Sequence, residues 1–326
     1  MFRPRNRAAF VLTSLVLGLL AVPVTARDHG GSIDGLQPMV RGTPVAAVAP
    51  TAATAPNALS EVLGGIPAFA LELNVNTFAQ QYATFDATSP GTSTRIGPVP
   101  VNQVASGTFI DNDFTHEYLL SKLNQLVAVD TSDGTSEVVG YPAPVLEYEF
   151  WTGVRWDPQT HNVYATTCTN DGSGCYLYTI DATTGDATRI AQVGVPGEGW
   201  FPMEIAIDSK GRLFMINIGP DYKNWLARID KQTGAVTPIG DTGISPMYIQ
   251  GLDFDRRDDT LYWTAMGNLS PTGGPQGQLY SVDTQTGEPT FLGVLPNGGS
   301  EIWAFAIATA PQVDDDTIFV DGFELP

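Results

Sequence analysis

The sequence predicts an all-β protein, a five-bladed β-propeller with four antiparallel strands per blade, from two repeated elements and a turn-rich composition. The 326 residues include 34 Gly and 24 Pro, and 43% of them are hydrophobic, which suits a large all-β core with many turns. One repeat is an Asp/Gly hairpin, and the other is a short apolar strand. Both recur with a period that is typical of propeller blades.

The hairpin repeat is clearest at residues 177–190, LYTIDATTGDATRI. An alternating apolar run precedes the Asp, which is expected to bind backbone amides ahead of it, and the Gly is expected to supply the positive φ of a tight reversal. The copies follow one another at intervals of 44, 51, 49 and 53 residues. Their Asp/Gly pairs are Asp86 and Gly91, Asp130 and Gly134, Asp181 and Gly185, Asp230 and Gly234, and Asp283 and Gly287.

The second repeat is expected to be the strand nearest the propeller axis. Its copies end at intervals of 46, 51, 47 and 53 residues, at Asp111, Asp157, Asp208, Asp255 and Ala308. Four residues before the end, four copies have a small residue, as expected where strands crowd an axis. These small residues are Gly107, Gly153, Gly251 and Ala304, and Glu204 holds the position in the remaining copy.

Further strands complete the blades and the ring. A polar turn and a second strand follow the inner strand at residues 163–166, 212–218 and 260–265, which gives four strands per blade. At the N-terminal end, three strands are expected without an inner one, at residues 70–76, 81–86 and 94–97. Residues 303–308 are an inner strand without its blade, so we expect them to close the ring by joining the first blade.

The chain is expected to divide into four parts. Residues 1–26 have the basic start, apolar stretch and V-T-A cleavage site of a signal peptide. Residues 27–63 are an Ala/Pro/Thr-rich linker, expected to be disordered. The propeller occupies residues 64–310, and residues 311–326 form an acidic tail. No later run could span a bilayer, so we expect export to the periplasm, the cell surface or the medium.

The acidic charge limits the class of partner. The formal net charge is −19 and becomes −22 when the three arginines of the signal peptide are removed. Binding to nucleic acid or to anionic membranes relies on Lys and Arg that neutralise phosphates, so we exclude nucleic-acid partners. A glycan or an extracellular protein remains as the partner class. We expect a monomer without a cofactor.

The two cysteines, Cys168 and Cys175, flank TNDGSG. In an exported chain this spacing favours a disulfide that closes a loop and stabilises the fold by roughly 2 to 3 kcal/mol. A metal site is the alternative, but two thiols without a nearby His fall short of a zinc set. Residues 170–172 (NDG) and 314–316 (DDD) offer oxygen ligands for calcium, but neither has the spacing of a calcium loop. We therefore expect no metal.

The hairpin copies resemble the LYxIDxxTG repeats of uncharacterised secreted bacterial β-propellers, over about residues 70–308. Residues 252–265, LDFDRRDDTLYWTA, are similar to the YWTD propeller repeat, although only this blade carries it and Ala265 replaces the final Asp. These resemblances imply a propeller fold and not a receptor function.

The C-terminal residues 313–326, VDDDTIFVDGFELP, resemble a short IFxDGFE ending of exported proteins from some Gram-negative bacteria. This resemblance implies sorting or surface attachment. The alternative is a mobile acidic tail that packs Ile318 and Phe319 on the domain.

Propeller topology assigns the loops to two faces. The inner-strand turns and hairpin turns share one face and are short, whereas the loops on the other face are long and varied, which is where a rigid scaffold usually carries function. Rings at this mouth could stack on sugars or clamp a peptide; alternatively, they fill gaps between blades. The candidate ligand-binding residues are Tyr148, Glu149, Phe150, Trp151, Arg155, Trp200, Phe201, Glu204, Tyr248, Gln250, Asp253, Glu301 and Trp303.

Glu204 is the one candidate catalytic residue. Its carboxylate is expected to point toward the axis, near Arg155 and Asp253, where desolvation would suit an acid or base. The alternative is a structural carboxylate satisfied by an Arg or by water. No GxSxG, HExxH or P-loop motif is present, and the chain has only three His. We therefore predict a secreted, non-catalytic binding module, with a carbohydrate-active hydrolase or lyase at the channel mouth as the alternative.

Overall fold

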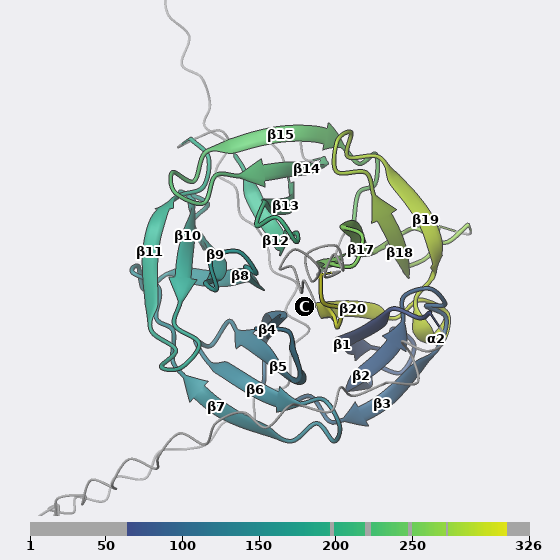
Figure 1. Ribbon diagram of the computed structural model, residues 1–326. Coiled ribbons are helices and arrows are strands. Elements are labelled where there is room, and N and C mark those ends of the chain that lie inside the picture. The colour runs from purple at the N-terminus through teal and green to yellow at the C-terminus, as the bar shows by residue number, and fades with distance from the viewer. Residues whose placement is uncertain (1–63, 196–198, 219–222, 247–249, 272, 312–326) are drawn as a thin grey trace, which may run out of the picture. The chain divides into compact units, whose positions relative to one another are not determined.

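A computed structural model shows the five-bladed β-propeller that the sequence predicts (Figure 1). It describes residues 64–195, 199–218, 223–246, 250–271 and 273–311. The predicted signal peptide, the predicted linker and all but the first residue of the predicted tail lie outside the described residues. Their assignments therefore remain predictions.

Each blade is an antiparallel sheet of four strands that follow one another from the axis outward. Blade 1 contains β20 (Glu301–Ile307), β1 (Pro67–Leu73), β2 (Gln80–Asp86) and β3 (Ser93–Gly97). Blade 2 contains β4 (Val104–Ile110), β5 (Asp113–Ser121), β6 (Leu126–Asp130) and β7 (Ser136–Gly140). Blade 3 contains β8 (Glu149–Trp156), β9 (Val163–Thr169), β10 (Cys175–Ile180) and β11 (Ala187–Gln192).

Blade 4 contains β12 (Phe201–Ile207), β13 (Leu213–Ile218), β14 (Asn224–Ile229) and β15 (Val236–Asp241). Blade 5 contains β16 (Gly251–Asp255), β17 (Thr260–Gly267), β18 (Gln276–Val282) and β19 (Pro289–Val294). A helical turn, α2 (Pro296–Gly299), connects β19 to β20. Within the part of the chain that the structure describes, no helix is long and apolar enough to cross a membrane.

The ring is closed by the C-terminal strand, as predicted. Strand β20 pairs antiparallel with β1, with Glu301 opposite Leu73 and Trp303 opposite Leu71. This pairing joins the two ends of the propeller in one sheet. It also protects the inner edge of blade 1, because an open strand edge would otherwise expose unpaired backbone groups.

The Asp of each hairpin repeat begins its turn as expected. Asp181 accepts hydrogen bonds from the amides of Thr183 (2.7 Å) and Thr184 (3.0 Å), and the other four aspartates bind amides in the same manner. The glycine has a positive φ in four copies. The expectation was wrong for Gly91, because Pro90 lengthens that turn by one residue and moves Gly91 out of the reversal position.

The hydrophobic core is divided into five clusters, one between each pair of neighbouring blades. Between blades 4 and 5, for example, Phe214, Phe254 and Trp263 are buried against one another. Full burial of each such side chain stabilises the fold by roughly 1.5 to 3 kcal/mol. The ring is therefore held together mainly by apolar contacts between sheets.

The small residues of the inner strands leave room for side chains from neighbouring strands. A Cβ atom at Gly153 would lie 2.7 Å from Glu204 Oε1. A Cβ atom at Gly107 would overlap Glu117 Oε1, and one at Gly251 would overlap Phe305. Crowding at the axis is thus the reason for these glycines, as the sequence predicted.

Two faces of the propeller follow from the strand order. The short-turn face carries the inner-strand turns at residues 111–112, 157–162, 208–212 and 256–259. The long-loop face carries the connections into the inner strands and the loops between second and third strands. Sheet twist takes the outer strands around the perimeter (Figure 1), so each hairpin turn also reaches the neighbouring blade. A Cβ atom at Gly140, for instance, would overlap the carbonyl of Thr184.

Candidate functional site

The axis of the propeller is filled by polar side chains that bridge the blades. Arg155 on β8 donates from Nε to the Ile205 carbonyl (3.2 Å) and from Nη2 to the carbonyls of Leu252 (2.7 Å) and Phe305 (3.3 Å). Its Nη1 lies 3.1 Å from Asp253 Oδ2, where the charges attract although the angle is not that of a hydrogen bond. Arg155 therefore connects blade 3 to blades 4, 5 and 1.

Glu204 lies in the same axial group. Its Oε1 accepts hydrogen bonds from Ser106 Oγ (2.8 Å) and from the Ile205 amide (2.9 Å), while Oε2 is buried without a hydrogen-bond partner. Glu204 and Arg155 are both 0% exposed. The structure thus brings together Glu204, Arg155 and Asp253, the three residues that the sequence placed near the axis.

A second axial glutamate, Glu117 on β5, was missed in the sequence. Its Oε2 accepts a hydrogen bond from the hydroxyl of Tyr82 (2.7 Å) in blade 1, and its Oε1 has no hydrogen-bond partner. A usable signal was present, because Glu117 shares its strand face with the apolar Leu119. A carboxyl on an apolar strand face is either buried and functional or buried and structural.

Burial determines the protonation of both glutamates. It raises the pKa of Glu117 and of Glu204 from 4.5 to about 8, although Arg155 and the hydrogen-bond donors act in the opposite direction. Both carboxyls are therefore protonated in the folded protein near neutral pH. A protonated carboxyl can donate a proton, but these two are completely inaccessible to a substrate in this structure.

Arg256 occupies the axis at the short-turn face. Its Nη2 donates to the carbonyl of Trp156 (3.1 Å), and its guanidinium lies 4.9 Å from the centre of the Trp156 ring. Only 6% of Arg256 is exposed. This contact spans from blade 5 to blade 3, so that end of the axis is also occupied by protein.

Aromatic side chains lie at the start of two inner strands on the long-loop face, where they pack against the core between blades 3 and 4. The rings of Phe150 and Phe201 are 6.1 Å apart, and Lys122 Nζ lies 5.9 Å from the centre of Phe150. Burial lowers the pKa of Lys122, while the carboxylate of Glu301 acts in the opposite direction. Lys122, Phe150 and Phe201 are half-buried, so part of each side chain reaches solvent, whereas Glu301 is buried.

Four other candidate residues, Trp151, Glu149, Gln250 and Trp303, are committed to internal contacts. Trp151 is fully buried and donates from Nε1 to Asn124 Oδ1 (3.0 Å). Glu149 accepts from the hydroxyls of Thr167 (2.6 Å) and Tyr178 (2.8 Å) and also pairs with Arg189.

Gln250 accepts a hydrogen bond from Trp263 Nε1 (2.7 Å), and Trp303 belongs to the core between blades 1 and 2. Tyr148 is 46% exposed on the connection between β7 and β8, and Tyr248 lies outside the described residues. Of the aromatic candidates whose placement is described, the accessible ones are thus Tyr148, Phe150, Trp200 and Phe201. A ligand-binding role for any candidate remains a prediction.

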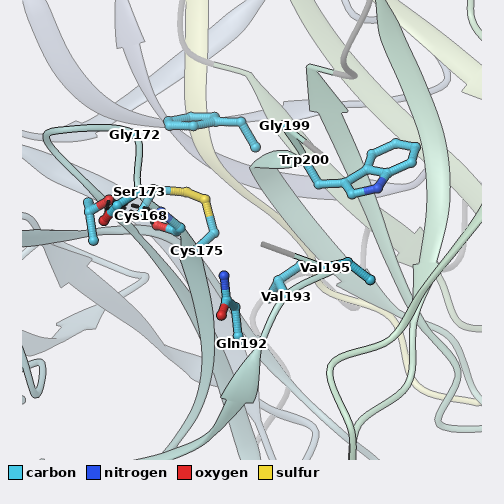
Figure 2. Close-up of a pocket in the computed structure, with 12 residues that line it drawn as sticks. Cys168, Gly172, Ser173, Cys175, Gln192, Val193, Val195, Gly199 and Trp200 are labelled. Atoms are coloured by element: carbon cyan, nitrogen blue, oxygen red, sulfur yellow. Dashed lines mark hydrogen bonds between the residues drawn. A yellow bond between two sulfur atoms is a disulfide. The ribbon is translucent and has the colours of Figure 1, made fainter. Parts of the chain in front are cut away.

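A pocket of about 210 Å³ lies on the long-loop face between blades 3 and 4. The disulfide between Cys168 and Cys175, which the sequence predicts, forms one wall. Figure 2 shows Gln192 beside this disulfide and Trp200 on the opposite side. The sequence placed the loop between the cysteines and the connection from β11 to β12 on one face, but it did not predict a pocket, because these two separate chain segments build it together.

Among the residues with described positions, no three His, Cys, Asp or Glu side chains are grouped so that they could hold a metal ion. The acidic loop at Asp171 is satisfied internally, since its Oδ1 accepts from the Ser173 amide (3.0 Å).

No family model matches this chain, and no curated protein matches it. Solved structures are similar to it at low identity. A protein of unknown function from Bacteroides thetaiotaomicron VPI-5482 is 11% identical with a TM-score of 0.45, over 65% of this chain and 52% of that chain. The exo-β-1,3-galactanase 1,3Gal43A from Clostridium thermocellum is 13% identical with a TM-score of 0.43, over 59% and 49%.

Bacteroides ovatus xyloglucan PUL GH43B is also 13% identical with a TM-score of 0.43, over 60% of this chain and 42% of that chain. The chain therefore spans about half the length of these three proteins. Similarity at this level carries no inference about ligand or activity.

Proposed function

We propose that this protein is an exported, non-catalytic binding module that holds a glycan or protein ligand on its long-loop face. One observation carries the proposal. Of the nine large hydrophobic residues that are exposed in the described part of the chain, six lie on loops of this face. They are Phe78, Leu123, Tyr141, Val145, Tyr148 and Val195, and the other three lie on outer strands.

Exposed apolar side chains that gather on one face commonly mark an interaction surface. Tyr141 is 67% exposed and Tyr148 is 46% exposed. Tyrosine suits such a surface because its ring gives a large apolar contact and its hydroxyl donates a hydrogen bond. The disulfide beside this surface is compatible with an oxidising compartment outside the cytosol.

The alternative function, a carbohydrate-active hydrolase or lyase, would use Glu204. Its carboxyl has the raised pKa of a general acid, yet it is fully buried and bound by Ser106. A general acid must reach the proton acceptor of its substrate directly or through one water. The burial of Glu204 therefore favours the binding module over the enzyme.

The test is a screen of the purified protein against a glycan array and against immobilised cell-surface proteins, with product release measured in parallel. We expect binding without product release, and weaker binding by the Tyr141→Ala/Tyr148→Ala double variant. The exposed Val138→Ala variant on β7 is the matched control and should bind normally. Product release that is abolished by Glu204→Gln would overturn the proposal in favour of the enzyme.

A further inference from the structure

We propose that the pocket beside the disulfide is a subsite for one uncharged sugar ring of a glycan. This inference rests on the proposed binding function of the long-loop face and names the chemistry of one place on it. The pocket is lined by residues of β9, β10, the end of β11 and the start of β12, together with the adjoining loops. None of the twelve lining residues is charged.

The size of the pocket limits its occupant. About 210 Å³ is less than the roughly 300 to 1,000 Å³ of pockets that enclose drug-sized ligands. A single ring with its hydroxyl groups is therefore a better fit than an oligosaccharide enclosed along its length. Further units of a longer glycan would lie across the face outside the pocket.

One wall of the pocket is fixed before any ligand binds. The disulfide joins Cys168 to Cys175, and the loop between them is held by hydrogen bonds from the Thr169 amide to the Gly174 carbonyl (2.9 Å) and from the Gly172 amide to the Thr169 carbonyl (3.1 Å). A preformed wall lowers the entropic cost of binding. This rigidity suits recognition of a small ligand that offers few contacts.

The polar groups of the pocket can bind hydroxyls. Gln192 supplies an amide and Ser173 a hydroxyl, so both donors and acceptors are present. Gly174 makes room for the amide, because a Cβ atom there would lie 2.9 Å from Gln192 Nε2. A sugar hydroxyl both donates and accepts, which matches this combination better than a carboxylate or an ammonium group does.

The apolar side of the pocket is formed by Trp200 with Val193, Val195 and Phe201 (Figure 2). The indole packs on backbone, since a Cβ atom at Gly194 would lie 2.7 Å from Trp200 Cδ1. Aromatic rings bind the C–H face of a sugar while polar groups bind its edge. The formal net charge of −19 also disfavours acidic sugars.

The experiment is isothermal titration calorimetry of the whole protein with cellotetraose, xylotetraose, mannotetraose and tetragalacturonate. We expect at least one neutral tetrasaccharide to bind and tetragalacturonate to bind at least about tenfold more weakly. Trp200→Ala and the near-isosteric Gln192→Leu should each weaken neutral-sugar binding by about tenfold, equivalent to about 1.4 kcal/mol. The exposed Gln285→Leu, on a hairpin turn of blade 5, is the matched control and should bind normally.

Two results would overturn the subsite. The first is that none of the neutral tetrasaccharides binds. The proposed binding function is tested separately, by the screen against the glycan array and the cell-surface proteins. The other is normal sugar binding by Gln192→Leu and Trp200→Ala when thermal unfolding shows both variants to be folded. If Tyr141→Ala/Tyr148→Ala then removes that binding, the proposed function stands and only the pocket fails.

Discussion

The two faces of the propeller differ in how their side chains are satisfied. On the short-turn side, aspartates bind the amides of their own turns or nearby cations, as Asp255 does with Arg257 (2.7 Å) and Asp157 with Lys231. On the long-loop side, large rings such as Tyr141 and Tyr148 remain exposed. Polar groups that are already bound offer little to a ligand, whereas exposed rings still have surface to bury. The short turns therefore build the ring, and the long loops are available for recognition.

The largest effect is expected from a substitution at the axis, which connects the two faces. Arg155→Ala should lower the free energy of unfolding by about 3 to 5 kcal/mol, because it leaves Asp253 buried without its cation. Lys210→Ala is the control: the exposed Lys210 side chain makes only a long ion pair with Asp259 (3.9 Å), so its loss should cost less than about 1 kcal/mol. Chemical denaturation measures both, and equal losses would contradict a structural role for the axis.

The pH dependence of stability tests the buried glutamates. The folded-state pKa of Glu117 and of Glu204 is raised from 4.5 to about 8, so the folded protein retains protons that the unfolded chain releases in this window. Stability should therefore fall as the pH rises from about 4.5 to 8 and then level off.

Thermal and chemical unfolding between pH 5 and 9 give the measurement. The Glu117→Gln/Glu204→Gln double variant should flatten the slope, while the exposed Glu137→Gln should leave it unchanged. An unaltered slope in the double variant would show that these carboxyls do not retain their protons. The loss at high pH would then belong to general charge repulsion.

The disulfide is expected to stabilise the fold and also to support the pocket on the long-loop face. The Cys168→Ser/Cys175→Ser double variant opens a short loop and should lower the free energy of unfolding by about 2 to 3 kcal/mol. Because the loop is also a wall of the pocket, sugar binding should weaken in the same variant. Denaturation and titration of one sample measure both, and weakened stability with intact binding would separate the disulfide from the pocket.

Crowding at the inner strands predicts a smaller effect. Gly153→Ala places a Cβ atom 2.7 Å from Glu204 Oε1 and 2.9 Å from Ile205 Cγ1, so it should cost about 1 to 3 kcal/mol. Gly91→Ala is the matched control, since no atom lies within 4 Å of its added Cβ and its φ is not positive. A comparison of their denaturation midpoints measures the difference, and similar midpoints would mean that the axis is less crowded than described.

The smallest effect should come from the exposed rings themselves. Tyr141→Ala and Tyr148→Ala remove side chains that are largely in solvent, so each should change stability by less than about 0.5 kcal/mol. A loss above about 1 kcal/mol in either variant would assign that ring to packing rather than to recognition. Denaturation curves of the two single variants decide this.

The ring could be predicted because its signals are local and repeated. Each hairpin has its own Asp and a following Gly, and four of the five inner strands have a small residue at the same position. Agreement among the copies therefore allowed each strand to be assigned to a blade. The exception among the turns, Gly91, failed because a single inserted residue changed the turn. Strand ends also shifted by a few residues where backbone pairing extends beyond the apolar pattern, as in β17 (Thr260–Gly267).

The site was less predictable because it depends on contacts between blades. Glu204 could be found because it replaces the small residue that the other four inner strands have at the same position. Glu117 lies on a second strand, where the sequence shows no such repeated position. The pocket combines the disulfide and Gln192, which strand pairing brings together within blade 3, with Trp200 from the connection into blade 4. Trp151 and Trp303 were placed on the correct face, but packing between blades, rather than their position along the strand, decides that they are buried.

Recognition by the long-loop face is tested most directly by hydrogen–deuterium exchange with and without the ligand that binds most tightly in the glycan and protein screens. We predict protection of the long-loop segments at residues 141–148, 170–174 and 192–195, with no change in the inner-strand turns at 157–162, 208–212 and 256–259. Protection confined to those turns, or to the inner strands around Glu204, would contradict a binding role for this face.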